Sequence, residues 1–208
     1  MLNRRHFLTA TGAALVASPL VAQTAPVTLT PPPAPEVVND LPLPPNVEGR
    51  FVIPEPFWAR VVDVRKSLPA GEIHILPQSR HLYFTLGNGK AIRYGCAIGQ
   101  EGLAYFGTAV VGRKVEWPSW TPTPEMIKRD PASYAKYADG MPGGPENPLG
   151  ARAMYLYENG RDTAIRIHGT TNPRSIGSAS SNGCFRMYNS HVIDLYKRVP
   201  IGTVTHAY

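Results

Sequence analysis

The chain has 208 residues, 43% of them hydrophobic, which is enough for one folded domain with a core and for further segments beside it. The formal net charge of +6 includes two arginines among the first five residues, so the remainder is only mildly basic. It shows no basic stripe with interleaved aromatic residues, which argues against nucleic acid as a partner. Attraction to an anionic wall polymer or membrane surface stays open, but it would be unspecific.

Residues 1–22 have the pattern of an export signal. Arg4 and Arg5 form a cationic start, and the apolar, small-residue-rich run that follows is too short for a comfortable membrane-spanning helix. The stretch "RRHFL" resembles the twin-arginine motif, whose translocon carries folded proteins across the inner bacterial membrane. An ordinary secretory signal is the alternative, and either route predicts a periplasmic protein. Cleavage after Ala22 fits, but Leu20 is larger than the small residue expected there, so retention as an anchor is left open.

Residues 23–58 are predicted to form a proline-rich tether. Between Pro26 and Pro56 a proline occurs at about every third position, which removes amide donors and restricts φ. Neither a helix nor a sheet is expected to propagate there. An extended chain of this kind spans about 3 Å per residue, enough to hold a domain away from a membrane.

Residues 59–208 are predicted to form one β-rich domain. Short runs rich in β-branched and aromatic residues, separated by turn residues, are typical of strands. They occupy residues 72–77, 81–86, 91–99, 151–157, 162–170 and 202–208. Gly87-Asn88-Gly89 and Glu158-Asn159-Gly160-Arg161 have the composition of hairpin turns.

Two helices are expected. One covers residues 123–130, with Thr123 as N-cap and Pro124 at the first helical position. The longer one follows Asn189 and runs to residue 199, because Val192, Leu195, Tyr196 and Val199 recur at helical spacing.

The two cysteines lie in different surroundings. A disulfide between Cys96 and Cys184 is the conventional expectation for an exported domain. Cys96, however, lies in an apolar strand pattern typical of a core thiol, whereas Cys184 follows the polar stretch Ser180-Ser181-Asn182-Gly183. We therefore expect Cys184 to be free and accessible. It needs a basic partner, since a thiol with a pKa near 8.5 is mostly protonated at neutral pH.

His168 is the histidine best placed to be that partner. It ends a predicted strand and precedes Gly169-Thr170, so it should lie at a sheet edge where loops build sites. A lone histidine at the end of a strand is more often structural. The combination of "HGT" with "SNGCFRM" about fifteen residues later changes that balance.

The pair of motifs resembles the L,D-transpeptidase catalytic domain, the peptidoglycan cross-linking cysteine enzymes of bacteria. "PGGPENPLGARAMYLY", "DLYKRVPIGTVT" and "HLYFTLGNGKAIRYGCAIG" are similar to further segments of that family, and together the likeness covers most of residues 72–206. It implies a mostly β, sandwich-like fold with a few short helices and one longer helix near the C-terminus. One departure is Asn182, where many members carry histidine.

The resemblance implies a mechanism. The Cys184 thiolate attacks the carbonyl of the third residue of a stem peptide, D-alanine leaves, and an amine accepts the acyl group. His168 takes the thiol proton, and the carbonyl of Gly169 orients its ring. The amides of Gly183 and Cys184 are candidate donors to the oxyanion.

Substrate contacts are less determined. Arg186 lies two residues after Cys184, hence on the same side of an extended chain, where it binds a substrate carboxylate or holds the loop. Ser181 contacts substrate or closes a turn, and Thr170 contacts substrate or caps local backbone. Trp117 and Trp120 are candidates for an aromatic wall over the stem peptide, though such residues more often fill a core.

Several alternatives remain open at this stage. The same scaffold could hydrolyse stem peptides as an L,D-carboxypeptidase or release wall-attached protein, and a non-catalytic wall-binding module with a disulfide is a third reading. An outer-membrane protein or lipoprotein is a further candidate acceptor. No cofactor and no metal is implied, because one site cysteine without a CxxC or His-x-His partner is poor zinc spacing. The resemblance also implies that a carbapenem acylates Cys184. The oligomeric state is not specified.

Overall fold

The computed structural model describes residues 42–208. The predicted export signal, residues 1–22, and residues 23–41 of the predicted tether lie outside the described residues. Within residues 42–208, no helix is both long and apolar enough to cross a membrane.

The last part of the predicted tether is folded. Two short antiparallel strands and a 3-10 helix occupy it: β1 (Val47–Glu48), β2 (Phe51–Val52) and η1 (Glu55–Phe57). Ile53 is buried in a small cluster with Ala97 and Tyr188, and the indole of Trp58 donates a hydrogen bond of 2.8 Å to the Ile53 carbonyl oxygen. Part of the segment assigned to the tether therefore packs against the domain. Strands of two residues need few amide donors, so the surrounding prolines do not prevent them.

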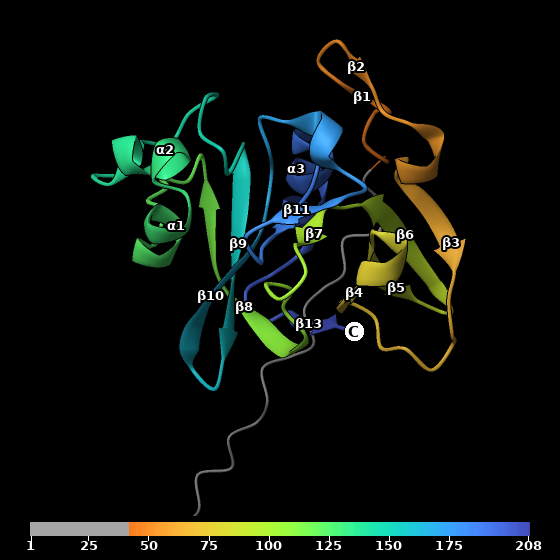
Figure 1. Cartoon of the computed structure of the whole chain (residues 1–208). Coiled ribbons are helices and arrows are strands. Elements are labelled where there is room, and N and C mark those ends of the chain that lie inside the picture. Colours follow the sequence, from red (N-terminus) through yellow and green to blue (C-terminus); the bar gives the residue numbers. More distant parts are fainter. Residues whose placement is uncertain (1–41) are drawn as a thin grey trace, which may run out of the picture. The chain divides into compact units, whose positions relative to one another are not determined.

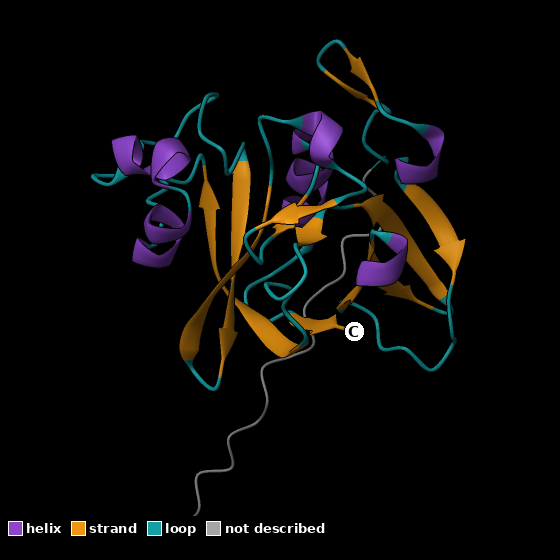
Figure 2. Ribbon diagram, in the orientation of Figure 1, coloured by secondary structure: helices purple, strands orange, loops and turns teal. Residues whose placement is uncertain are grey.

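Nine strands form one hydrogen-bonded sheet (Figures 1 and 2). Its order is β12-β10-β9-β8-β13-β4-β5-β6-β3, with parallel pairing of β10 with β12 and of β4 with β13. The strands are β3 (Arg60–Asp63), β4 (Ile73–Leu76), β5 (His81–Gly87), β6 (Lys90–Gly95), β8 (Gly107–Glu116), β9 (Arg152–Glu158), β10 (Arg161–His168), β12 (Phe185–Arg186) and β13 (Val204–Ala207). A separate parallel pair joins β7 (Ile98–Gly99) to β11 (Ala179–Ser181).

Both predicted hairpins are confirmed. Strands β5 and β6 pair on either side of Asn88, and β9 and β10 pair on either side of Asn159. The two asparagines have φ of 51° and 50°, a left-handed conformation that Asn and Gly tolerate best. Turn chemistry in the sequence thus located these two connections correctly.

The helices are short except for one. They are α1 (Pro124–Arg129), α2 (Pro131–Tyr134), α3 (Asn189–Arg198) and the 3-10 helices η2 (Pro77–Ser79), η3 (Ala135–Tyr137) and η4 (Pro173–Ser175). The predicted cap of α1 is confirmed, because the Thr123 hydroxyl accepts a hydrogen bond from the Met126 amide. Helix α3 differs at its start: Asn189 is its first helical residue, Tyr188 is the N-cap, and no side chain caps the helix there.

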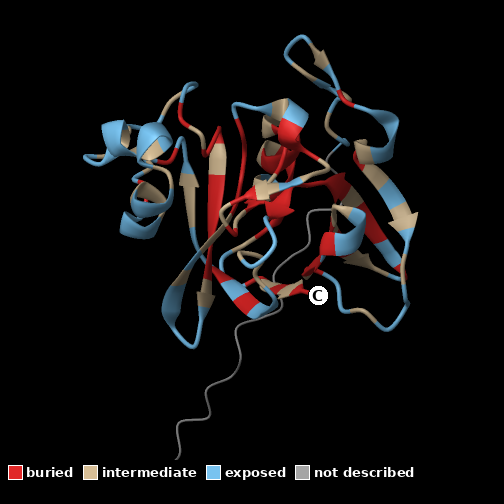
Figure 3. Ribbon diagram, viewed as in Figure 1, coloured by how far each residue is buried: buried red, intermediate tan, exposed pale blue. Residues whose placement is uncertain are grey.

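One core lies between the two halves of the sheet and α3 (Figures 1 and 3). It contains Ile73 and Leu82 from one half, Leu156 and Ile167 from the other, and Leu195 from α3, all 0% exposed. The apolar faces of the two halves and of α3 thus bury one another in a single core. The mostly β, sandwich-like class with one longer C-terminal helix is confirmed, although its strands belong to a single hydrogen-bonded sheet.

A buried ion pair within α3 is joined to the sheet by one hydrogen bond. Within the helix, the Arg198 guanidinium donates to Asp194 at 2.9 and 3.0 Å, with the arginine side chain 0% exposed. Tyr94 of β6 donates its hydroxyl to the same carboxylate at 2.5 Å. Since burial of a charge is costly without partners, each group here depends on the others.

Candidate active site

Cys184 and His168 approach the same cleft from neighbouring strands. His168, the last residue of β10, pairs in register with Arg186 of β12. Side chains alternate along a strand and registered neighbours share a face, so Cys184, two residues before Arg186, lies on the face that carries His168. All three residues line a cleft of about 510 Å³. Strand pairing thus brings together a thiol and an imidazole that lie sixteen positions apart in sequence.

The imidazole of His168 is held in one orientation. It is 4% exposed, and Nδ1 lies 2.6 Å from the carbonyl oxygen of Gly169. Since a carbonyl only accepts, Nδ1 carries the proton and Nε2 is left as the basic nitrogen. Burial, and next the charge of Arg186, lower the pKa of His168 to about 4, while the backbone carbonyls of Gly169 and Leu149 act in the opposite direction. The ring is therefore neutral at neutral pH and able to accept a proton.

Cys184 is a free thiol, as is Cys96, so the expected alternative of a disulfide between them is wrong. The Cys184 Sγ donates a hydrogen bond of 3.7 Å to the carbonyl oxygen of Ala164, not to the imidazole. Burial raises the pKa of this thiol, and the backbone and charge of Arg166, together with the charge of Arg186, oppose that effect. The thiol is therefore protonated in the resting protein. The positive charges of Arg166 and Arg186 would stabilise the thiolate when the proton leaves.

Cys96 is a core residue, as predicted. It is 0% exposed, and burial raises its pKa to about 12. A thiol in that environment is inert at neutral pH.

The turn before Cys184 is closed by Ser181. The Ser181 side chain is 1% exposed; its hydroxyl donates to the Cys184 carbonyl oxygen and accepts from the Gly183 amide at 3.2 Å. Of the two roles expected for Ser181, closing a turn fits this geometry. Because the Gly183 amide already has a partner, the Cys184 amide is the remaining predicted donor for an oxyanion.

Gly183 is required by its backbone. Its φ is +116°, and a Cβ there would lie 3.0 Å from the carbonyl oxygen of Leu103. Only glycine adopts this conformation without strain, and it lets the chain turn directly before Cys184.

The cleft holds a second cation that sequence reasoning missed. Arg166 lies two residues before His168 on β10 and lines the same cleft. Asp162 holds its guanidinium in a bidentate pair at 2.6 and 2.9 Å, and the guanidinium stacks over the Tyr155 ring at 4.1 Å from the centroid. Arg166 and His168 are two residues apart in "RIH", and side chains two apart on a strand share a face. This spacing could have indicated Arg166 from the sequence. Arg186 lines the cleft beside it, half-buried.

Of the two tryptophans predicted to form an aromatic wall, only Trp120 lines the cleft. Trp120 lines the cleft, where its ring contacts Tyr134 and Tyr137 edge-on at 6.1 and 5.8 Å between centroids. Trp117 is 46% exposed and is not among the residues lining the cleft. It directly follows the end of β8 and has φ of 45°, so the strand conformation ends at this residue.

Thr170 does not line the cleft either. It is 4% exposed, and its hydroxyl accepts from the Asn172 amide, so it organises local backbone, as the structural alternative expected. Asn189 holds the same segment: its side chain accepts from the amides of Ala151 and Thr170 at 2.9 and 3.3 Å and donates to the Thr170 carbonyl at 2.9 Å. Asn189 therefore supports the loop whose Gly169 carbonyl orients the His168 ring.

Asn182 is the residue that departs from the family pattern. It links the turn before Cys184 to the helical segment 124–137, part of which lines the cleft. Its side-chain oxygen accepts from the Arg129 guanidinium at 2.5 Å, and its Nδ2 donates to the Tyr134 hydroxyl at 3.0 Å. Asparagine serves both contacts because it is both donor and acceptor.

Metal-ligating side chains converge elsewhere. Within residues 42–208 the one group of three or more histidine, cysteine or carboxylate ligands is Glu72, His74 and His206, none of which lines the cleft.

The family model and the curated relatives indicate the same family. The model of the L,D-transpeptidase catalytic domain matches residues 70–206. A putative L,D-transpeptidase of Fuscovulum blasticum is 43% identical over 105 residues, covering 50% of each chain. The probable L,D-transpeptidase YbiS of Escherichia coli is 36% identical over 128 residues, covering 61% of this chain and 40% of that one. The chain thus spans half or less of the length of these curated relatives.

Solved structures agree on the fold. A Brucella melitensis structure described as a probable carnitine operon oxidoreductase is 51% identical, covers 72% of this chain and 92% of its own, and has a TM-score of 0.52. L,D-transpeptidase 3 from Mycobacterium tuberculosis is 12% identical, covering 67% of this chain and 61% of its own, with a TM-score of 0.51, a likeness of fold alone. Since the family model covers well over half of its residues, the chain belongs to the L,D-transpeptidase catalytic domain family.

Proposed function

We propose that the protein is a peptidoglycan L,D-transpeptidase with Cys184 as nucleophile and His168 as general base. The observation that carries the proposal is a free thiol and a neutral, oriented imidazole lining one cleft from neighbouring strands. Membership of the family supplies the class of reaction.

Acylation begins with movement of one proton. At rest the Cys184 Sγ donates to the carbonyl of Ala164, so for the transfer it must turn from that carbonyl toward Nε2 of His168. Sγ then forms a bond to the carbonyl carbon of the third stem residue while Nε2 takes the thiol proton. Both groups are neutral at rest, so the transfer accompanies the attack. The cations Arg166 and Arg186 stabilise the developing thiolate.

The tetrahedral intermediate collapses by breaking the bond to D-alanine. His168 returns its proton to the leaving amine, and a thioester on Cys184 remains. The Cys184 amide stabilises the oxyanion, and a donor in that position is worth about 3 kcal/mol. A side-chain amine of a second stem then attacks the thioester, giving a 3-to-3 cross-link and regenerating the thiol.

Substrate recognition rests on charge and on one aromatic wall. Stem peptides carry carboxylates, and the guanidinium of Arg186 faces the cleft without a side-chain ion pair among the described residues. Arg166 is neutralised by Asp162 and contributes less net charge. Trp120 supports the stem from the helical side of the cleft. Arg186 is therefore the proposed carboxylate contact.

The decisive test is the product of the purified protein with disaccharide-tetrapeptide, analysed by mass spectrometry. Cross-linked dimers and free D-alanine support transfer to an amine. Tripeptide monomers alone would mean that water is the acceptor and that the protein is an L,D-carboxypeptidase on the same scaffold.

The nucleophile and the base are tested separately. A carbapenem should add covalently to the wild-type chain and not to C184A. H168Q should lower kcat/KM for D-alanine release by ~10²–10⁴, the usual contribution of a general base. A carbapenem adduct that persists in C184A would reject the assignment of the nucleophile.

We also propose export to the periplasm by the twin-arginine route, on the basis of "RRHFL" in residues 1–22. Replacing Arg4 and Arg5 together by lysine should hold the precursor in the cytoplasm. Normal export of that variant would favour the general secretory route instead. An outer-membrane protein or lipoprotein remains a candidate acceptor, to be tested as a substrate in the same mass assay.

A further inference from the structure

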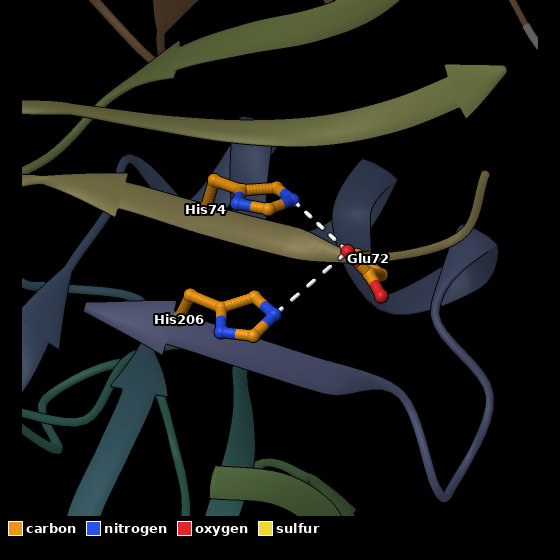
Figure 4. Close-up of side chains that lie close together, drawn as sticks. All are labelled: Glu72, His74 and His206. Carbon is orange, nitrogen blue, oxygen red and sulfur yellow. Dashed lines mark ion pairs between the residues drawn. The ribbon is translucent and has the colours of Figure 1, made fainter. Parts of the chain in front are cut away.

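Three ligand-type side chains meet on the central strands, away from the cleft (Figure 4). Glu72 Oε2 lies 3.2 Å from His74 Nε2 and 3.8 Å from His206 Nε2. All three ligand atoms lie within 4.8 Å of one another. Figure 4 shows both rings pointing their Nε2 atoms toward the same carboxylate oxygen.

Strand pairing builds this arrangement. His74 of β4 and His206 of β13 are direct partners in a parallel pair, and Glu72 precedes His74 by two residues. Alternation along the strand therefore places all three side chains on one face. Ile73, between Glu72 and His74, and Thr205, directly before His206, are 0% exposed, and the same alternation places them on the opposite face. The grouping joins segments more than 130 residues apart in sequence.

Hydrogen bonds at the other ring nitrogens orient both histidines. His74 Nδ1 lies 2.8 Å from the Tyr208 hydroxyl, and His206 Nδ1 lies 3.0 Å from the Thr108 hydroxyl. Such a partner on the far nitrogen is what metal-binding histidines generally have, because it fixes the ring and leaves Nε2 free to ligate. The rings also stack, with centroids 5.0 Å apart.

The buried Nε2 of His74 has the Glu72 carboxylate as its partner. His74 is 5% exposed, and its Nε2 lies 3.2 Å from Glu72 Oε2, an ion-pair contact. Beyond that contact, this nitrogen makes no hydrogen bond within the described residues. A cation between the three ligand atoms would give both the buried nitrogen and the carboxylate a common partner.

We propose that Glu72, His74 and His206 form a zinc-binding site, with solvent as the fourth ligand. Ligand atoms about 2.0–2.1 Å from a tetrahedral zinc lie roughly 3.3 Å from each other, and the contacts of 3.2 and 3.8 Å are close to that spacing. Two imidazoles and one carboxylate suit zinc better than calcium or magnesium, which prefer oxygen ligands. Glu72 and His206 keep part of their surface open, which provides an entry path and room for water.

The site would act on the stability of the domain. Strand β13 lies between β4 and β8, four strands from β12 in the sheet order, or about 20 Å from the active-site edge at the usual strand spacing. Zinc would tie the C-terminal strand to β4 at that position. A ligand at about a hundredfold its Kd should raise the melting temperature by roughly 5–10 °C for a domain of this size.

The test uses the full chain in a C184A background, so that the nucleophilic thiol contributes no metal binding. After removal of metal with EDTA, zinc is titrated calorimetrically and melting temperatures are measured with and without zinc. We expect one zinc per chain and a rise in melting temperature. H206Q and E72Q should each weaken binding by at least about tenfold, the effect seen when the ligand shells of a metal are disturbed, and should therefore reduce the rise by about half or more.

H81Q is the matched control, because His81 bonds the Pro56 carbonyl and belongs to no ligand cluster. It should bind zinc like the C184A parent. Melting of H206Q without zinc verifies that this variant is folded. Zinc binding that is equal in the parent, H206Q and E72Q would overturn the proposal, as would the absence of zinc binding in the folded parent.

Discussion

Asn189 supports the catalytic loop from outside the cleft, and its removal should be costly. Its side chain accepts from the amides of Ala151 and Thr170 and donates to the Thr170 carbonyl. Ala151 and Thr170 are 2% and 4% exposed, so water does not readily replace the lost partner. Three hydrogen bonds at about 1 kcal/mol each give a loss of about 3 kcal/mol in the free energy of unfolding for N189A.

The same change should impair catalysis. The segment that Asn189 holds includes Gly169, whose carbonyl lies 2.6 Å from His168 Nδ1 and sets the ring orientation. A Cβ at Gly169 would lie 2.1 Å from the Asn189 side-chain oxygen, which shows how closely that side chain packs on the loop. Because displacements of an ångström in a catalytic group cost up to about 10²-fold, we expect kcat/KM for D-alanine release to fall at least about tenfold.

Urea unfolding and steady-state rates measure the two effects. A 3 kcal/mol loss corresponds to a fall of roughly 6–12 °C in melting temperature for a domain of this size. N189D should recover part of the stability, because one oxygen still accepts from the two amides. The control is N172A in the same loop, where the asparagine is exposed and its side chain makes no hydrogen bond within the described residues. Equal stability and equal rates for N189A and N172A would refute the reasoning.

Three further predictions concern the segment over the cleft, the helix α3 and a buried histidine. N182A should lose both bonds to the helical segment 124–137 and speed amide hydrogen exchange there, while global stability changes little; unchanged exchange would count against the link. D194A should lower the free energy of unfolding by about 3–5 kcal/mol, since it leaves the Arg198 charge buried with fewer partners, and urea unfolding measures this. Burial lowers the pKa of His191 to about 4, so the unfolded chain binds a proton at this histidine more readily than the folded chain does. The stability that the neutral ring contributes is therefore lost as pH falls from 6.5 toward 4, by about 2 kcal/mol at pH 5. H191F should therefore lose less stability than wild type between pH 7 and pH 5, and equal losses would contradict this.

Local features of the fold were predicted well because local chemistry controls them. Asn88 and Asn159 mark hairpin turns whose left-handed backbone favours Asn and Gly, and Thr123 caps a helix through its own hydroxyl. The start of α3 was misjudged at Asn189. Its side chain belongs to a loop and a strand end that the helix meets only in the folded chain, so the capping pattern was a poor guide.

The chemistry of the cleft was predicted in part. The nucleophile and base candidates, Cys184 and His168, line one cleft, whereas the Gly183 amide bonds to Ser181 and Trp117 does not line the cleft. The sequence does not distinguish Trp117 from Trp120. Which of the two lines the cleft depends on how the segment turns after β8, and the sequence pattern does not show that turn. Arg166 was missed since its role depends on which neighbour pairs with β10.

The amino-acid sequence by itself determined the family, the mostly β class, the turns and the two residues proposed for proton exchange, because these follow from short-range patterns and motif spacing. Tertiary structure decided which groups meet across strands: the proposed zinc ligands Glu72, His74 and His206, the Asn182 link and the cationic surroundings of Cys184. Distances between residues remote in the chain are set by sheet register and packing, and no local propensity encodes them.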